Sequence, residues 1–399
     1  MKFARACLRR AKTIVAYWQD ATLVLENYRN RIRISADPET VSILHFFEAW
    51  RSPADFYASM TGYDRGSLVA GLRQLTRLGF LVQEGSQEAL LDLQLEKAWS
   101  PWLPAAGFLH FSCKDLQYMD LKAQRRDLRR RAKQLPPPSP VKHYPRATQV
   151  ALPAPNTNGD FPRVLLARRT WRQFSSGPVT LADLATLLWL TWGVQAWWDL
   201  PIGRVALKTS PSGGARHPIE AYVWALKVEG LPGGLYHYAA DTHRLELLRR
   251  GRGARKLGRY LGNQGYFGST GAVMFMTAVF SRTQWKYQDP GSYRTVLVEA
   301  GHLCQTFCLA ATWLGLAPFC TQALADSLIE KDLGIDGVSE SVLYATGVGA
   351  RPSGADWAPD PKGLRWGIAR VPFYIPTGRP TQRAFAGALL AFRSTFPRN

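Results

Sequence analysis

An apolar strand followed by a long apolar helix constrains the fold of this chain more than any other feature. The stretch GAVMFMTAVF, residues 271–280, is almost wholly apolar, which is typical of a strand in the centre of a sheet. The stretch TVLVEAGHLCQTFCLAATWLGL, residues 295–316, has helical length but is interrupted by Glu299, His302 and Gln305. These polar residues predict a helix in the protein core and not a membrane span.

Further strands and helices surround this pair. LADLATLLWLTWGVQ, residues 181–195, predicts a strongly apolar helix, and EAYVWALKV, residues 220–228, predicts a strand. GGLYHYAADTHRLELLR, residues 233–249, predicts a hairpin, and ESVLYATGVGARP, residues 340–352, a final strand. The mixture predicts an α+β fold in which helices cover a central sheet.

The first 110 residues predict a separate, winged-helix-like domain. A hairpin pattern covers residues 22–34, three helical patterns begin near Asp37, Ser52 and Asp64, and FLVQEGS then predicts a strand. At 399 residues the chain is long enough for such a module beside a catalytic domain.

A winged helix suggests DNA binding, but the charge of this module is low. The whole chain carries a formal net charge of +20, whereas residues 1–100 hold 13 Lys and Arg against 11 Asp and Glu. The third helical pattern offers Arg65, Arg73, Gln74 and Arg77 as DNA contacts. Recognition of a peptide by strand addition needs no basic surface, so we favour peptide over nucleic acid as the partner.

Residues 111–160 predict a boundary made of a basic helix and a Pro-rich linker. Residues 101–150 contain 10 Lys and Arg against 3 Asp and Glu. The basic run is either a solvated helix face or a dock for an acidic partner. Residues 161–399 then form the predicted catalytic domain.

The cysteines favour a reducing compartment. Their number is odd and no pair has CxxC spacing, so we predict reduced thiols in the cytoplasm and no bound metal. The N-terminus shows no uninterrupted apolar run of the kind found in secretory signals. The five are Cys7, Cys113, Cys304, Cys308 and Cys320.

Several familiar catalytic motifs are missing from the sequence. It contains no GxxxxGK[ST], GxSxG or HExxH, which argues against P-loop nucleotide chemistry and common hydrolases. TGVGARPSG follows a predicted strand, but Pro352 stands where a dinucleotide fingerprint needs its third glycine.

Two motifs could hold a phosphorylated, flat ligand. In ARRTWRQF, Arg168, Thr170 and Arg172 combine forked donors with a hydroxyl, which suits phosphate oxygens, although a plain surface run has the same pattern. In SPSGGARHPIE, Ser212 can donate a hydrogen bond and Gly213 lets the backbone approach a ligand, although an ordinary loop also explains it.

A third motif, QWKYQDPGSYR, places Lys286 and Tyr287 between the apolar strand and the long helix. A lysine that an aromatic ligand partly desolvates can act as a base near neutral pH, and a phenol can relay a proton or stabilise negative charge. In the helix, Glu299 and His302 have i, i+3 spacing and are expected to satisfy one another in the core.

In this order, the motifs resemble nitroreductase-like flavoenzymes, and within them the SagB-type or ThcOx-type azoline dehydrogenases. ARRTWRQF is similar to a flavin-phosphate motif, with Thr170 in place of the usual Ser, and KY with YRTVLVEAGHLCQ is similar to the family's Lys-Tyr pair and following helix. The resemblance covers about residues 160–350. It implies a nitroreductase-like fold, a homodimer, and FMN at the subunit interface.

The resemblance also implies roles for individual residues. Arg168, Thr170 and Arg172 would hold the FMN phosphate and ribityl chain, with Arg351 as a further phosphate ligand. Lys286 and Tyr287 would be catalytic, with the choice of base between them open. Ser212 and Gly213 would contact the isoalloxazine, and Gln322 and Ala323 would lie near flavin N5.

The implied reaction is oxidation of a thiazoline or oxazoline in a ribosomally made peptide, with O2 accepting the electrons. A precursor peptide and a cyclodehydratase would then be partners. The alternatives are an NAD(P)H-dependent nitro or quinone reductase of the same fold, another FMN-dependent peptide oxidation, and a basic nucleic-acid-binding or scaffold protein.

Overall fold

The computed structural model describes residues 6–134, 158–200, 203–251 and 253–353. The predicted Pro-rich linker and the C-terminal residues after 353 thus fall largely outside the described residues. None of the helices in the described ranges combines the length and apolarity that a membrane span requires.

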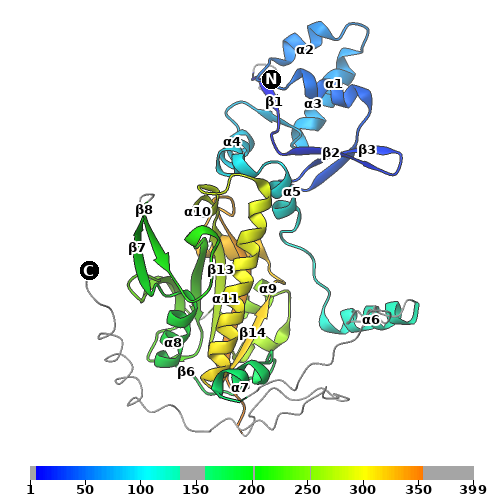
Figure 1. The fold of residues 1–399 in the computed structure, drawn as a ribbon. Helices are drawn as coiled ribbons and strands as arrows, with labels where there is room; N and C mark the ends of the chain where they lie inside the picture. Colours follow the sequence, from blue (N-terminus) through cyan, green and yellow to red (C-terminus); the bar gives the residue numbers. More distant parts are fainter. Residues whose placement is uncertain (1–5, 135–157, 201–202, 252, 354–399) are drawn as a thin grey trace, which may run out of the picture.

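The N-terminal module contains two small antiparallel sheets (Figure 1). One has the order β2-β3-β4, and β1 pairs with β5 in the other. The predicted hairpin is confirmed as β3 and β4, and an additional strand, β2, extends it. The strands are β1 (Leu8–Arg10), β2 (Ile14–Gln19), β3 (Thr22–Asn27), β4 (Ile32–Ser35) and β5 (Leu81–Gln83).

Three capped helices follow, as predicted. The side chains of Asp37, Ser52 and Asp64 each accept a backbone N–H of the first helical turn, which ends the preceding loop and begins the helix. Their apolar faces share a core that includes Phe47 and Leu72. The helices are α1 (Pro38–Phe46), α2 (Pro53–Ser59) and α3 (Arg65–Arg77).

The chain then passes from the module to the catalytic part through α4 (Gln87–Trp99), the 3-10 turn η1 (Ser100–Trp102) and α5 (Ala105–Ser112), as Figure 1 shows. The basic run becomes α6 (Leu121–Gln134), whose arginines are exposed. This agrees with the solvated-face interpretation of that run.

The catalytic part is built on a six-stranded sheet in which every neighbouring pair is antiparallel. Two shorter pairs, β6 with β10 and β7 with β8, lie outside it. In sheet order the six strands are β12 (Arg244–Arg250), β11 (Gly234–Ala239), β9 (Ile219–Ala225), β13 (Ala272–Val279), β15 (Glu340–Ala350) and β14 (Leu316–Thr321); the shorter ones are β6 (Val179–Thr180), β7 (Ala196–Leu200), β8 (Gly203–Leu207) and β10 (Val228–Glu229).

Helices cover both faces of this sheet because side chains along β13 alternate between them. Met274 and Met276 pack under α8 (Leu181–Trp192) and α11 (Tyr293–Trp313). Val273 and Phe275 pack on the opposite side, where α9 (Ala254–Tyr260) and α12 (Asp326–Leu333) lie. The predicted α+β fold with a covered central sheet is therefore confirmed. The structure also describes α7 (Asp160–Ala167) and α10 (Phe280–Gln284).

Candidate functional site

The segment before β9 runs along the exposed side of α11. The Ser210 and Thr306 hydroxyl oxygens lie 2.8 Å apart, and His302 Nδ1 lies 3.3 Å from the Pro211 carbonyl oxygen. These contacts fix the start of the predicted Ser/Gly turn against the middle of the helix.

This turn meets the Lys-Tyr pair. Gly214 has a φ of +62°, and a Cβ added to it would stand 2.8 Å from Lys286 Nζ and 2.9 Å from Tyr287 Oη. The positive φ and the close approach of the two side-chain ends both favour glycine at this position. The structure thus brings together Gly214 and Lys286, which are 72 residues apart in the sequence.

The Lys-Tyr pair itself is held through its backbone. The amides of Lys286 and Tyr287 donate to the Thr283 carbonyl at 3.1 and 2.9 Å, directly after α10. The Tyr287 carbonyl accepts from the fully buried Trp102 indole at 3.0 Å, so the N-terminal part of the chain positions the pair. Lys286 is exposed, however, and the expected partial desolvation is not provided within this one chain.

Glu299 is a buried carboxyl beside the turn. Its Oε1 lies 3.8 Å from His217 Nδ1, and its Oε2 has no hydrogen-bond partner among the described residues. Burial raises the pKa of Glu299 to about 7, against the opposing effect of a Ser212 hydrogen bond. The expected Glu299–His302 pairing is wrong, because α11 turns Glu299 inward while His302 stays exposed. The clue in the sequence was the apolar spacing that placed Glu299 with the core positions.

The arginine-rich motif lies at the other end of α11. Trp171 donates its amide to the Pro318 carbonyl at 2.9 Å, which fixes the motif beside β14. Arg351 stacks on Trp171 and donates to the Thr312 carbonyl at 3.1 Å. Arg168 is half-buried, and no carboxylate among the described residues pairs with it. The motif and Arg351 therefore share one region, as the resemblance implies.

The two groups of candidate residues are far apart within one chain. A Cβ on Gly213 would touch Thr295 near the start of α11, whereas Arg351 binds the Thr312 carbonyl near its end. At 1.5 Å per residue these two helix positions are about 26 Å apart. The Lys-Tyr group and the arginine group of one chain thus form two separate half-sites.

The segment proposed to reach flavin N5 is engaged in internal contacts. The Ala323 amide donates to the Thr321 hydroxyl at 3.0 Å, and the Gln322 carbonyl accepts from the Tyr118 hydroxyl at 3.3 Å. Gln322 is exposed. Of the two predicted residues, Ala323 therefore has its N–H already bonded, and Gln322 is held by the segment that follows α5.

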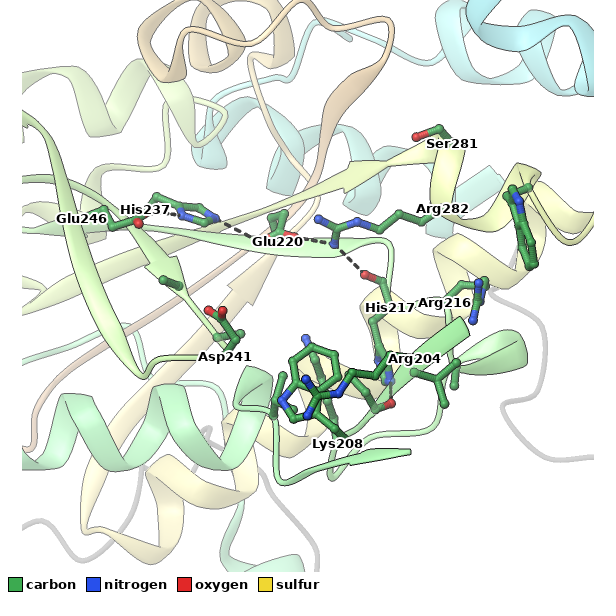
Figure 2. A pocket seen from close by; sticks show the side chains of 18 residues that line it. Arg204, Lys208, Arg216, His217, Glu220, His237, Asp241, Glu246, Ser281 and Arg282 are labelled. Carbon is green, nitrogen blue, oxygen red and sulfur yellow. Dashed lines mark hydrogen bonds and ion pairs between the residues drawn. The ribbon is translucent and has the colours of Figure 1, made fainter. Parts of the chain in front are cut away.

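A cavity of about 950 Å3 lies beside the Lys-Tyr pair, between β7, β8, β9 and α10 (Figure 2). No sequence pattern predicted this cavity. At its centre Glu220 bonds His237 at 3.0 Å and Arg282, and Glu246 bonds the other nitrogen of His237 at 2.8 Å. Hydrogen bonding to Glu220 raises the pKa of His237 to about 9. The cavity wall thus carries a fixed imidazolium between two carboxylates.

His237 gives a prediction about pH. Its folded pKa of about 9 lies above the ordinary 6.5, so its stabilising contribution is complete below pH 6.5 and is lost as pH rises through 9. In the wild type, the urea concentration at the midpoint of unfolding should fall as the pH rises from 6.5 to 9. In His237→Gln this fall should be smaller, as measured by urea unfolding at several pH values. The exposed His45→Gln should leave it unchanged. A wild-type midpoint that is constant from pH 6.5 to 9 would contradict this prediction.

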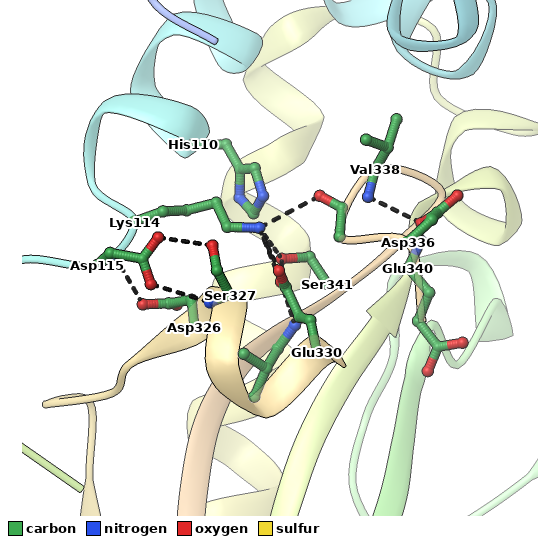
Figure 3. Close-up of polar contacts among 12 residues, drawn as sticks. His110, Lys114, Asp115, Asp326, Ser327, Glu330, Asp336, Val338, Glu340 and Ser341 are labelled. Atoms are coloured by element: carbon green, nitrogen blue, oxygen red, sulfur yellow. Dashed lines mark hydrogen bonds and ion pairs between the residues drawn. The ribbon is translucent and has the colours of Figure 1, made fainter. Parts of the chain in front are cut away.

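A buried ion pair joins the N-terminal part to the sheet (Figure 3). Lys114 Nζ lies 2.8 and 2.6 Å from the two carboxylate oxygens of Glu330, and also contacts the Ser341 hydroxyl at 3.4 Å. Next to it, Asp115 accepts from the Ser327 amide at 2.9 Å. Because α12 begins four residues after Gln322, these contacts anchor one end of the segment that carries Gln322.

Comparisons with known proteins agree with this architecture. The nitroreductase family model matches residues 165–350. A Methanocaldococcus jannaschii protein that carries the name nitroreductase is 32% identical over 172 residues, which cover 43% of this chain and 83% of that protein. The trifolitoxin-processing protein TfxB of Rhizobium leguminosarum bv. trifolii is 33% identical over 142 residues, covering 35% of this chain but only 38% of that protein.

Among solved structures, the Escherichia coli microcin synthetase complex McbBCD with truncated pro-MccB17 contains a chain that matches with a TM-score of 0.43. The identity is 19%, and the match covers 66% of this chain and 93% of that chain. The family model spans residues 165–350, which hold the six-stranded sheet and α11, and the M. jannaschii protein is 32% identical over 83% of its own length, so we conclude that this chain belongs to the nitroreductase family.

Proposed function

We propose that the protein is an FMN-dependent dehydrogenase that oxidises a thiazoline or oxazoline in a ribosomally made peptide to the aromatic azole. The observation that carries this proposal is the contact between the Gly213–Gly214 turn and the Lys286–Tyr287 pair. Because the turn lacks Cβ atoms, Lys286 Nζ and Tyr287 Oη come close to its backbone, and a flat ring beside the turn would have two proton-transferring groups at its edge. The relative named as a trifolitoxin-processing protein supports a peptide substrate.

The residues at the arginine-rich half-site fit the FMN phosphate. Arg168 and Thr170 are half-buried, Arg172 is exposed, and Arg351 is oriented by Trp171. The guanidinium of Arg168, with which no carboxylate among the described residues pairs, suits a phosphate dianion. These four residues would hold the phosphate end, and Ser212 and Gly213 would contact the isoalloxazine.

The separation of the half-sites supports a homodimer in which each FMN contacts two chains. The two half-sites lie about 26 Å apart along α11, farther than one FMN extends. The outer face of α11 exposes Leu297, Val298 and Trp313 at 40, 55 and 38%, which is unusual for a long helix beside a core. In the proposed dimer this face packs against a second copy, which would also cover Lys286.

Bound FMN would supply the acceptor for a hydride from the azoline carbon. Lys286 Nζ or Tyr287 Oη would take the accompanying proton, so that the ring loses two hydrogens in total. The Trp102 bond to the Tyr287 carbonyl would hold both groups against the turn. Glu299, a buried carboxyl beside the turn with a pKa of about 7, would take up and release protons at neutral pH. O2 is the proposed final electron acceptor.

The N-terminal module would recognise the peptide. Among the described strands, β4 pairs only with β3 in the sheet β2-β3-β4 and presents its other edge, which is the geometry that strand addition requires. The azoline must be formed before it is oxidised, so a cyclodehydratase would act first and is the proposed protein partner.

The test is direct. Purified protein should show a flavin absorbance spectrum and, in air, should remove two hydrogens from an azoline-containing peptide, as measured by mass spectrometry. A colourless protein that takes up no FMN, or a flavoprotein that leaves the azoline intact, would overturn the proposal.

The M. jannaschii relative favours one alternative, an NAD(P)H-dependent nitro or quinone reductase. The two functions separate in one experiment. Rapid bleaching of the bound flavin by NAD(P)H without azoline oxidation would favour the reductase, whereas bleaching by the azoline peptide under argon would favour the dehydrogenase.

The dimer gives its own prediction. Val298→Glu should place a charge on the outer face of α11, and we expect the protein to become monomeric and to lose most of its FMN. Light scattering and flavin absorbance measure the two effects. Leu248→Glu, on the edge strand β12 with a 49% exposed side chain, is the matched control and should do neither. A monomeric Val298→Glu protein that keeps its FMN would contradict the two-chain site.

A further inference from the structure

Three of the five cysteines meet in the core. Cys304 and Cys308 lie one turn apart on α11 and face β14, where Cys320 stands. Their three sulfur atoms all lie within 4.8 Å of one another. Cys304 and Cys308 are 7 and 5% exposed, and Cys320 is half-buried, so Cys320 is the member of the cluster that solvent reaches most.

This cluster was not expected from the sequence, which shows no CxxC pair. The i, i+4 spacing of Cys304 and Cys308 puts both thiols on one helix face, and the turn between α11 and β14 brings Cys320 opposite them. Cys7 and Cys113 lie elsewhere, on the N-terminal part of the chain. The proposed flavin chemistry uses none of the three clustered thiols.

The geometry of the cluster is close to that of a thiolate metal site. Zinc–sulfur bonds are about 2.3 Å, so three sulfurs around one ion lie about 4 Å apart. The separations here need to shorten by less than about 1 Å, which small side-chain rotations supply. The positive charge of Arg168 lies close enough to interact with Cys320, which would offset the net negative charge of three thiolates around a divalent ion. Thiolates favour Zn2+ and Cu+ over hard cations.

We propose that Cys304, Cys308 and Cys320 bind a thiophilic metal cation through three thiolates, with Zn2+ as the ion of first choice. The fourth coordination position lies on the side of Cys320, the thiol that solvent reaches most. Binding releases the thiol protons and forms three metal–sulfur bonds, with no change in oxidation state. The ion would brace α11 against β14 at the arginine-rich half-site.

The test uses the reduced, untagged full chain, stripped of metal and titrated with Zn2+ and, separately, Cu+ against a chromophoric chelator. Cd2+ serves as a spectroscopic substitute because cadmium thiolates absorb in the ultraviolet. We expect one ion per chain, and at least about 100-fold weaker binding in Cys304→Ser, Cys308→Ser and Cys320→Ser. The matched control, Cys7→Ser with Cys113→Ser, should bind like the wild type. Tighter binding of Cu+ in competition would identify copper as the ion.

A second measurement keeps the proposal falsifiable if a serine variant fails to fold. In the wild type, the bound metal should protect three of the five cysteines from alkylation, and peptide mapping should identify them as the clustered three. Absence of a cadmium–thiolate band together with unchanged alkylation would overturn the proposal. So would equal metal affinity in a folded cluster variant. Both readouts are independent of FMN and of azoline oxidation.

Discussion

Lys286→Ala is expected to slow azoline oxidation by about 100-fold or more while FMN remains bound, because proton transfer by a positioned side chain contributes about 10²–10⁴-fold to a rate. Tyr287→Phe should slow the oxidation by the same factor or by less. The variant with the larger loss of rate identifies the base. Single-turnover reduction of the flavin by the azoline peptide, followed by absorbance, measures the step directly. This is the largest catalytic effect that we predict.

The control for this experiment is Lys227→Ala, which removes an exposed lysine from the turn after β9. It should leave both FMN binding and the rate unchanged. If Lys286→Ala and Tyr287→Phe each oxidise the peptide at the wild-type rate with FMN in place, neither residue is the base. Loss of FMN in Lys286→Ala would instead assign the lysine to cofactor binding.

Lys114→Met should destabilise the protein by about 3–5 kcal/mol, because it leaves Glu330 charged and buried without its partner. The side chains of Lys114 and Glu330 are only 11 and 6% exposed, so solvent offers little compensation. Adding Glu330→Gln should recover most of the loss, since the amide removes the charge and still accepts hydrogen bonds from the Ser341 hydroxyl and the Val342 amide. The midpoint of urea unfolding measures both variants.

The ion pair between Lys256 and Asp332 serves as an exposed control for the buried pair. Its nitrogen and oxygen atoms lie 2.9 Å apart, and the lysine side chain is 50% exposed. Lys256→Met should cost less than about 1 kcal/mol. Equal losses in Lys114→Met and Lys256→Met would mean that the buried pair does not anchor the N-terminal part. If Lys114→Met unfolds in two phases and only the first phase is shifted from the wild type, the destabilisation lies in the contact between the N-terminal part and the rest of the chain.

Periodicity was a reliable guide to individual elements here. The strand at 271–280 and the helix at 295–316 appear as β13 and α11 within a few residues, because a doubly buried strand and a core helix carry strong apolar patterns. Strand β2 was not predicted, because the alternating pattern at residues 22–34 was already accounted for by a two-stranded hairpin. The prediction that Glu299 pairs with His302 was wrong, because the spacing of two residues along a helix does not show which helix face is covered by a neighbouring segment.

The sequence by itself determined the α+β class, the three capped helices of the module, and the motifs that carry the family resemblance. Only the tertiary structure decided that the Lys-Tyr pair meets the Gly213–Gly214 turn, that the two half-sites stand at opposite ends of α11, and that three cysteines share one point in the core. The physical reason is that local patterns report the burial and backbone preference of each segment. Contacts between distant segments depend instead on how the helices and strands pack, and no local pattern encodes that packing.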